Sequence, residues 1–306
     1  MTAIPTRSRN ITMTDPKGTL IAIGGNEKKE LNDTEERFQI HFGEGFILQD
    51  ILKYAGDSKS RIEVITSASE IPEVVGRKYT ETFKRLGVEN VGILNIISRQ
   101  RANHPKTLRR IEEADAILFS GGDQCRISRF LKETKSHHLI VDRYINDSFV
   151  IAGTSAGAVA MSEEMIAGGR TGNILRKDDL KMGKGLGLMK QVIFDSHFIR
   201  RHRFGRLAEA VALYPDKLGV GLGEDTGVVI TEGNKLEIIG SGMVVLFDGS
   251  NLVFNQYHQL KNKVAVSLAN LTVHILATKD KYYIREKKAE IHYDANHHKG
   301  EFTKFE

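Results

Sequence analysis

Residues 148–161 read SFVIAGTSAGAVAM, an apolar β-branched run that passes without a break into small, helix-forming residues. This pattern predicts a buried strand that turns sharply into an amphipathic helix, AGAVAMSEEMIA at 156–167. The turn has the form G-x-S-x-G, in which Gly153 and Gly157 remove Cβ atoms that would otherwise clash. We therefore expect Ser155 to stand exposed at the carboxyl end of a central strand, where open α/β sheets place their ligands. A serine that only caps the helix is the simpler alternative.

Four earlier segments have the same strand character and alternate with segments of helical period, as in the stripe of Val75, Tyr79, Phe83 and Leu86. The strand segments read TLIAIGG at 19–25, RIEVITSAS at 61–69, NVGILNI at 90–96 and ADAILFSGGDQ at 114–124. This alternation predicts an α/β three-layer sandwich with a mostly parallel central sheet. Beyond residue 215, glycine-punctuated strands indicate antiparallel hairpins and a mixed sheet.

The chain has 306 residues and no repeat or linker that divides it. We expect a polar tail over 1–17, one catalytic domain over 18–249, and a β-rich C-terminal extension over 250–306 packed on that domain. No apolar run approaches the ~18 residues that a membrane span requires. Basic and acidic residues number 44 and 39, so neither nucleic acid nor a membrane is expected as a partner. A single cysteine, Cys125, and the lack of a secretory signal core favour the cytoplasm.

A second glycine loop, SGGDQ at 120–124, ends the strand before the quoted stretch and should lie beside Ser155 on the same edge of the sheet. We expect the backbone amides of Gly122 and Ala156 to bind an oxyanion there, and Gln124 to hold a substrate. An ordinary strand-to-helix turn is the alternative. The adjacent Cys125 lacks the sharp turn, so we do not expect it to act as a nucleophile.

A serine nucleophile needs a base, and His197 follows the apolar run VIF at the end of another predicted strand. We expect His197 to reach Ser155 if the two strands are neighbours, and His202 is a weaker candidate. The sequence after residue 290 also contains His292, His297 and His298. These three lack acidic partners at a regular spacing, so we expect no metal and no cofactor.

Three arginines after His197 recur at every third position: Arg200, Arg203 and Arg206. The spacing predicts one face of a helix, and Arg201 flanks that face. The planar guanidinium fork suits recognition of a carboxylate, so we expect these arginines to bind a carboxylate of the substrate. A solvated basic face is the alternative.

Taken in chain order, the motifs SGGDQ, AGTSAGA, MIAGG, GLGL, D-x-HF-x-x-R-x-R-x-x-RL and GEDT resemble those of the cyanophycinases, in the serine peptidase family that also contains the aspartyl dipeptidases. The resemblance covers residues 18–249. It implies a fold similar to class I glutamine amidotransferases, a homodimer, and hydrolysis of cyanophycin, a poly-aspartate bearing arginine on its side chains, to β-aspartyl-arginine dipeptides. It also implies that Ser155 is the nucleophile and His197 the base, and that five residues line the substrate pocket: Gln124, Asp195, Arg201, Arg203 and Arg206.

The chain departs from this family at two positions. Where the family has a glutamate after MIAGG to orient the histidine, the chain has RTGN, which assigns that role to Asn173. An asparagine can orient an imidazole but cannot stabilise its charged form as a carboxylate does, so Glu164, Asp178 or Glu224 could substitute. The second departure is Ser196, where the family has glutamine. An aspartyl or isoaspartyl dipeptidase and a non-catalytic anion-binding relative therefore remain open as alternatives.

Overall fold

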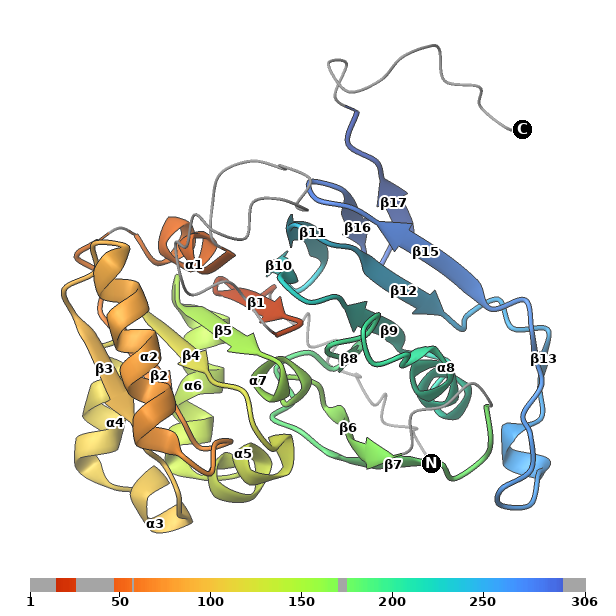
Figure 1. Ribbon diagram of the computed structural model, residues 1–306, viewed down its shortest axis with the longest axis horizontal. Coiled ribbons are helices and arrows are strands. Elements are labelled where there is room, and N and C mark those ends of the chain that lie inside the picture. Colours follow the sequence, from red (N-terminus) through yellow and green to blue (C-terminus); the bar gives the residue numbers. More distant parts are fainter. Residues whose placement is uncertain (1–14, 26–46, 57, 170–174, 294–306) are drawn as a thin grey trace, which may run out of the picture.

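The computed structural model describes residues 15–25, 47–56, 58–169 and 175–293. Five strands form the parallel half of its main sheet: β1 (Thr19–Ile23), β2 (Ile62–Ile65), β3 (Val91–Leu94), β4 (Ala116–Phe119) and β5 (Val150–Thr154). Their order is β1-β5-β4-β2-β3, so the strand before Ser155 has a parallel neighbour on each side (Figure 1). Each of the five lies within a segment that the sequence predicted as a strand.

The other half of this sheet is antiparallel. Four strands continue it beyond β1: β10 (Thr226–Thr231), β11 (Lys235–Gly240), β16 (Lys281–Tyr283) and β17 (Lys288–Glu290). The sheet therefore has nine strands in all, and the expectation of a mostly parallel sheet is correct only for the half that contains β5. The reason is that β10 and β11 are joined by a short turn, and such a connection can only return the chain antiparallel.

A second sheet packs beside the first. It contains β8 (Val192–Asp195), β9 (Leu218–Leu222), β12 (Val244–Asp248) and β15 (Thr272–Leu276), in the order β15-β12-β9-β8. Strands β8 and β9 are parallel, because the helix α8 (Phe204–Leu213) connects them as a crossover. The other two pairs in this sheet are antiparallel.

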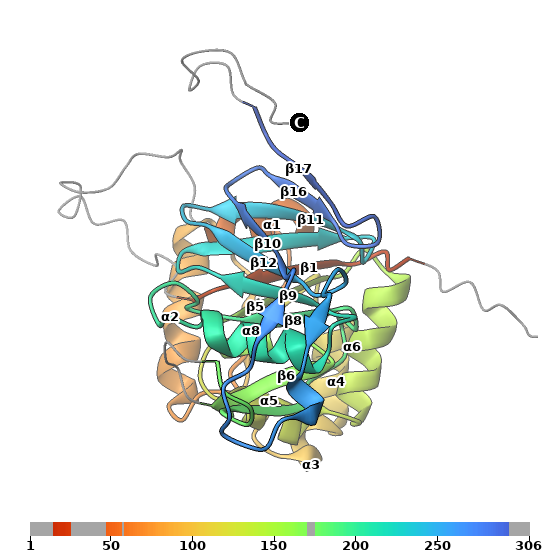
Figure 2. The ribbon, with the colours of Figure 1, turned by 90° about the vertical axis from the view of Figure 1, so that its right-hand side faces the viewer.

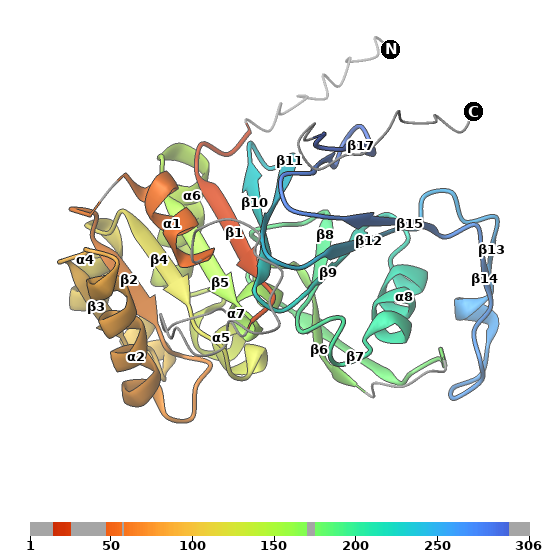
Figure 3. The same cartoon turned by 45° about the horizontal axis from the view of Figure 1, so that its top comes forward.

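Two small hairpins complete the strands of the described residues. The first pairs β6 (Glu164–Gly169) with β7 (Leu180–Lys184), and the second pairs β13 (Phe254–Asn255) with β14 (Leu268–Ala269) around the short helix η1 (Tyr257–Gln259). Figure 3 shows α8 and the second hairpin on the side of the molecule away from the early helices. Among the strands after residue 250, β15 joins the second sheet, whereas β16 and β17 join the first.

Helices cover both faces of the parallel half, as Figure 2 shows. One face carries α1 (Ile47–Ala55) and α2 (Pro72–Arg85). The other carries α3 (Arg99–Ala102), α4 (Pro105–Glu112), α5 (Gln124–Leu131), α6 (Lys135–Asn146) and α7 (Ala156–Val159). The predicted stripe on α2 is confirmed, since Tyr79 and Phe83 are buried against the sheet. In the described ranges, no helix combines the length and the apolar character needed to cross a membrane.

The helix after Ser155 is much shorter than the sequence suggested. Helix α7 ends at Val159, and the residues that looked like its continuation form strand β6 instead. The cause is tertiary: the Ala160 carbonyl accepts a hydrogen bond from Leu186 at 2.7 Å, and the Glu163 carbonyl accepts one from Gly185 at 2.9 Å. Carbonyls that a longer helix would use are thus bonded elsewhere, and local propensity is overridden.

The two glycines of G-x-S-x-G are required by packing. A Cβ on Gly157 would lie 2.2 Å from the carbonyl oxygen of Phe119 on β4, and a Cβ on Gly153 would lie 2.6 Å from the carbonyl carbon of Gly157. Backbone atoms cannot move aside as a flexible side chain can. The absence of both side chains lets α7 pack directly on β4 and β5 and so fixes the position of Ser155.

We predict that Gly157→Ala lowers the free energy of unfolding by about 1–3 kcal/mol, the usual range for overpacking. Denaturant-induced unfolding measures this difference. Gly168→Ala is the matched control, because a Cβ there would meet no atom within 4 Å. Equal stability of the Gly157→Ala variant and the wild-type protein would contradict this account of the turn.

Candidate active site

Ser155 has a backbone conformation that residues with a side chain rarely adopt, with φ 51° and ψ −112°. Its amide donates to the carbonyl of Ile23 on β1 at 2.9 Å, so the neighbouring strand holds the conformation in place. Strained residues of this kind persist only where the surrounding structure determines them, and they cluster at functional sites. The turn presents Oγ of Ser155 at the carboxyl end of β5.

His197 contacts this hydroxyl directly. The distance from its Nε2 to Oγ of Ser155 is 3.0 Å, a hydrogen-bonding distance. His197 follows β8, which belongs to the second sheet, so it reaches Ser155 although the strands that precede the two residues are not neighbours. The link runs instead through the loop after β1, where the carbonyl of Gly24 accepts a hydrogen bond from the amide of His197 at 2.9 Å.

Gly25 lies against both side chains of this pair. A Cβ at that position would lie 2.6 Å from Nε2 of His197 and 3.2 Å from Cβ of Ser155, and the φ of Gly25 is 102°. Only glycine fits there without displacing the imidazole or straining the backbone. Because Gly24 and Gly25 have no side chains, the two sheets can approach closely enough for the hydrogen bond between Ser155 and His197 to form.

A carboxylate completes the arrangement on the other side of the imidazole. Oε1 of Glu224 lies 2.7 Å from Nδ1 of His197, and Oε2 accepts a hydrogen bond from Arg200 at 2.9 Å. Glu224 follows β9 and His197 follows β8, so the parallel pairing of these strands brings the two residues together. With Nδ1 donating to the carboxylate, Nε2 is left to accept the Ser155 proton.

The other candidates for this orienting role are elsewhere or not described. Asn173, the residue that the resemblance assigned, lies outside the described residues. Glu164 forms an ion pair with Lys184. The backbone carbonyl of Asp178 accepts a hydrogen bond from Lys263, and within the described ranges no contact joins Asp178 to His197.

The electrostatic environment keeps His197 neutral. Burial lowers the pKa of its imidazole, the nearby guanidinium groups of Arg201 and Arg203 act in the same direction, and the hydrogen bond to Glu224 opposes them. Burial alone would raise the pKa of Glu224, but hydrogen bonds from His197 and Arg200 outweigh it, so that pKa lies below its usual value. At neutral pH the pair therefore holds a carboxylate and an uncharged imidazole, the state in which Nε2 can accept a proton.

The second glycine loop lies beside this pair, as the sequence indicated. Strand β4 pairs with β5, and a Cβ on Gly121 would lie 3.5 Å from Cβ of Ser155. Gly122 is exposed with φ 143°. Among the described residues, neither the amide of Gly122 nor that of Ala156 donates to a backbone carbonyl. Within the described ranges, both N–H groups are thus free of backbone acceptors at the edge of the sheet where Oγ of Ser155 stands.

Gln124 and Cys125 open helix α5 just after this loop. The side-chain amide of Gln124 donates to the carbonyl of Ile166 on β6 at 2.8 Å, so it fastens that hairpin to the loop. Asp123 caps α5 by accepting the amide of Cys125 at 2.8 Å. Burial raises the pKa of the Cys125 thiol, which leaves it protonated and unreactive at neutral pH, in agreement with the argument from the sequence.

The arginines after His197 do not share a helical face. The chain from Phe198 to His202 forms turns, and α8 begins only at Phe204. Arg201 is exposed, and within the described residues no hydrogen bond or ion pair involves its side chain. Arg200 is bound to Glu224 rather than free to face a substrate.

Asp195, Arg203 and Arg206 form a buried group instead of a solvent-facing pocket. Their exposed fractions are 0%, 9% and 8%. Nε of Arg206 lies 2.9 Å from Oδ2 of Asp195, and a terminal nitrogen of Arg203 lies 3.0 Å from Oδ1. Burial lowers the pKa of Arg203 to about 10, which leaves its guanidinium charged at neutral pH. The three charged groups contact one another, and that these side chains line the substrate pocket stays a prediction.

Residues 40–239 match the family model described as peptidase family S51. The chain belongs to peptidase family S51. It is 34% identical over 284 residues to a cyanophycinase of Trichormus variabilis, an alignment that covers 92% of this chain and 91% of the relative. A cyanophycinase of Thermosynechococcus vestitus is 34% identical over 269 residues, or 88% of this chain and 80% of the relative.

A solved structure supports the fold of this S51 chain. A peptidase from an acI-B1 actinobacterium superimposes with a TM-score of 0.61 over 89% of this chain and 98% of its own, at 18% identity. At that identity the likeness shows the fold alone. From the sequence, Glu224 in the GEDT motif was only one of three acidic candidates to orient His197. Recognising it required the β8-α8-β9 crossover, which places the residues after β8 and β9 at the same edge.

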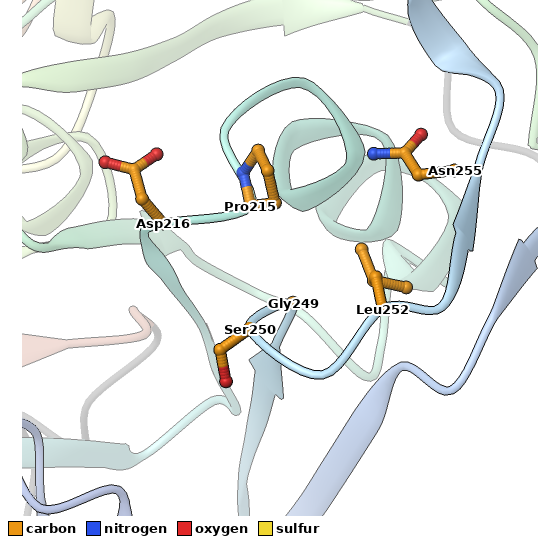
Figure 4. A pocket seen from close by; sticks show the side chains of 6 residues that line it. All are labelled: Pro215, Asp216, Gly249, Ser250, Leu252 and Asn255. Atoms are coloured by element: carbon orange, nitrogen blue, oxygen red, sulfur yellow. The ribbon is translucent and has the colours of Figure 1, made fainter.

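A surface pocket with a volume of about 390 Å³ lies apart from the Ser155 and His197 pair. It is lined by Pro215, Asp216, Gly249, Ser250, Leu252 and Asn255, and Figure 4 shows Asp216 and Asn255 on opposite sides of it. The side chain of Asn255 is already bonded to the carbonyl of Ala212 at 2.8 Å. The pocket therefore lies at the junction between the end of α8 and the hairpin of β13 and β14.

Within the described residues, no group of three or more histidine, cysteine or acidic side chains is placed to hold a metal ion.

We predict that the imidazole of His197 titrates below the 6.5 of an unperturbed histidine, and that Glu224→Gln lowers its pKa further. The second effect follows because the carboxylate stabilises the imidazolium and the amide does not. A pH titration of the ring resonances by NMR measures both values. Glu237→Gln on β11 is the control and should leave the His197 pKa unchanged. A His197 pKa that rises in Glu224→Gln would contradict the assigned contact.

Proposed function

We propose that this S51 peptidase hydrolyses cyanophycin to β-aspartyl-arginine dipeptides through an acyl-enzyme on Ser155. One observation carries the proposal: Oγ of Ser155, the imidazole of His197 and the carboxylate of Glu224 form a continuous chain of hydrogen bonds. This order of groups is the one by which serine peptidases activate a hydroxyl. The relatives at 34% identity, which carry the name cyanophycinase, support the choice of polymer.

The mechanism begins when Nε2 of His197 accepts the proton of Ser155 as Oγ attacks the scissile amide carbonyl. The carbonyl oxygen becomes an oxyanion, which the amides of Gly122 and Ala156 stabilise. His197 then gives the proton to the departing amine, the carbon–nitrogen bond breaks, and the acyl group stays on Ser155. Water, activated by the same imidazole, releases the acyl group and restores the hydroxyl.

Glu224 takes the role that the sequence gave to Asn173. Its carboxylate holds Nδ1–H and so fixes the tautomer in which Nε2 is a base. The carboxylate also stabilises the imidazolium that forms after proton transfer, which an asparagine could not do. Five residues remain the proposed contacts to the substrate: Gln124, Asp195, Arg201, Arg203 and Arg206. Arg201 is exposed and lies four residues beyond His197.

The geometry favours catalysis over a non-catalytic anion-binding relative, because such a protein has no need of a strained serine bonded to a neutral histidine. No feature of the described residues favours an aspartyl dipeptidase over a polymer-degrading enzyme. Hydrolysis rates on intact polymer and on short α-linked and β-linked aspartyl dipeptides would separate these two activities.

We propose further that residues 18–249 form one catalytic domain with a fold similar to class I glutamine amidotransferases, in which Ser155 lies on a nucleophile elbow. The strand order β1-β5-β4-β2-β3 and the sharp turn after β5 support this assignment. Residues 250–306 would then pack on that domain as an extension, in line with the pairing of β15, β16 and β17. A cytoplasmic homodimer is proposed from the resemblance and from the single cysteine.

We predict that Ser155→Ala lowers the rate of dipeptide release from purified cyanophycin by about 10⁵–10⁶-fold while the protein stays folded. The loss is large because the remaining groups of a catalytic triad do little without the nucleophile. Ser128→Ala on α5 should keep the wild-type rate, since its hydroxyl binds only the Lys184 carbonyl. Release by Ser155→Ala at the wild-type rate would end the proposal.

We predict that Arg201→Gln raises the KM for a substrate with a free carboxylate by about tenfold or more and changes kcat little, as expected for the loss of a charge-assisted hydrogen bond. Steady-state kinetics on a short cyanophycin oligomer with a free terminal carboxylate gives both constants. Arg77→Gln, on an exposed position of α2, is the control. An unchanged KM would remove Arg201 from the binding site.

A further inference from the structure

The loop that follows β2 packs against the glycine loop beside Ser155. Its residues 66–69 are buried, and the carbonyl of Ala68 accepts a hydrogen bond from the amide of Asp123 at 3.0 Å. A Cβ on Gly122 would lie 2.2 Å from the oxygen of that same carbonyl. The position of Ala68 therefore determines where the backbone of Gly122 can lie.

The direction of the Gly122 amide depends on this contact. The φ of Gly122 is 143°, a value that residues with a side chain rarely adopt and that glycine can leave easily. Rotation about φ turns the N–H of Gly122 relative to the next peptide, which the carbonyl of Ala68 holds. The neighbouring Gly121 is close to the nucleophile, since a Cβ there would lie 3.5 Å from Cβ of Ser155. A shift of Ala68 would thus redirect an N–H group beside the reacting hydroxyl.

One side chain holds the chain on both sides of Ala68. Arg126 on α5 donates from Nε to the carbonyl of Ser67 at 3.2 Å, and from a terminal nitrogen to the carbonyl of Ser69 at 3.3 Å. The guanidinium is a rigid plane, so the directions of its donors are fixed relative to one another. Arg126 therefore fixes the two peptides that flank the carbonyl in contact with Gly122.

The charge of Arg126 serves no ion pair within the part of the chain that the structure describes. Its guanidinium donates to backbone carbonyls, and its central carbon lies 5.5 Å from the centroid of the Phe130 ring. Loss of an arginine is most costly where it leaves a carboxylate buried alone. A neutral replacement of Arg126 leaves no such carboxylate among the described residues, so its effect on the site can be measured in a folded protein.

We propose that Arg126 is a positioning residue for the oxyanion site: by holding the carbonyls of Ser67 and Ser69, it keeps the N–H of Gly122 directed at the oxyanion. This inference rests on the proposed function, since it concerns the oxyanion of that reaction. Loss of one oxyanion donor typically lowers kcat by about 10²–10³-fold, and an error of about 1 Å in the position of a group costs about 10²-fold. Arg126 itself contacts neither the substrate nor the reacting atoms.

A matched arginine lies at the opposite, amino-terminal edge of the sheet. A terminal nitrogen of Arg143 on α6 donates to the carbonyls of Ile111 and Ala114, each at 2.6 Å. Its guanidinium carbon lies 4.0 Å from the centroid of the Phe149 ring. These partners precede β4 and β5, whereas Ser155 follows β5. Loss of Arg143 therefore removes the same kinds of contact at a distance from the site.

The experiment compares Arg126→Met with Arg143→Met by three readouts. The first is kcat and KM on a short cyanophycin oligomer with a free terminal carboxylate. The second is the rate at which a small neutral fluorophosphonate labels Ser155, because the phosphoryl oxygen of this reagent takes the place of the oxyanion. The third is the pKa of His197, measured from its ring resonances by NMR.

We expect Arg126→Met to lower kcat and the labelling rate by about 10²-fold each, with KM within about twofold of wild type. The pKa of His197 should not change, because the carboxylate and the imidazole of the site are untouched. Arg143→Met should match the wild-type protein in all three readouts.

Four results would overturn the positioning role of Arg126. They are wild-type kcat and labelling rates in Arg126→Met, a raised KM with a wild-type labelling rate, a shifted His197 pKa, and an equal loss of rate in Arg143→Met. The second would place Arg126 in substrate binding, the third would place its effect on the base, and the fourth would show a general loss of stability. A wild-type protein that the reagent does not label at Ser155 would instead overturn the proposed function.

Arg126→Lys tests the inference if Arg126→Met does not fold. Lysine keeps the charge and can donate to one of the two carbonyls, but it lacks the planar fork that holds both. We expect kcat and the labelling rate to fall by about tenfold, again with little change in KM. Wild-type values of both rates in Arg126→Lys would overturn the inference.

Discussion

The hydrogen bond between Oγ of Ser155 and Nε2 of His197 joins two separate sheets, and the arrangement of the rest of the site depends on it. Ser155 is placed by β5 and by its pairing with β1, whereas His197 is placed by β8. The sheets can approach because Gly24 and Gly25 have no side chains at the point of contact. A Cβ on Gly24 would lie 1.8 Å from the carbonyl oxygen of Gly223. The two central groups of the site are therefore held by backbone packing between sheets rather than by a flexible loop.

Charge is arranged differently on the two sides of His197. On one side, Glu224 is paired but partly exposed, so it can stabilise an imidazolium without fixing the ring permanently in the charged state. On the other side, Asp195, Arg203 and Arg206 are enclosed and contact one another, while Nε of Arg203 is buried with no hydrogen-bond partner among the described residues. Buried ion pairs contribute little to stability beyond what apolar residues would give, but removing one partner is costly.

Much of this arrangement could be predicted from the sequence, and the parts that could not have identifiable causes. The five parallel strands and the G-x-S-x-G turn follow from local patterns of apolar residues and glycine, and His197 was identified from its place after an apolar run. Glu224 was one of several candidates, because the chain beyond residue 215 read as antiparallel hairpins and concealed the parallel pairing of β8 with β9. The helical face predicted from the three-residue spacing of the arginines does not form, because turns occupy the first part of that segment. In each case a tertiary contact decided what local periodicity could not.

The most direct test of the account is to trap the acyl-enzyme. Protein mixed with purified cyanophycin, quenched in acid during turnover and digested, would be examined by mass spectrometry for a covalent adduct. We predict that the mass of the substrate acyl group appears on the peptide that contains Ser155, and that it is absent in Ser155→Ala. Turnover with an adduct on Cys125, or with no adduct on Ser155 in a burst-phase sample, would contradict the central claim that this strained serine is the nucleophile.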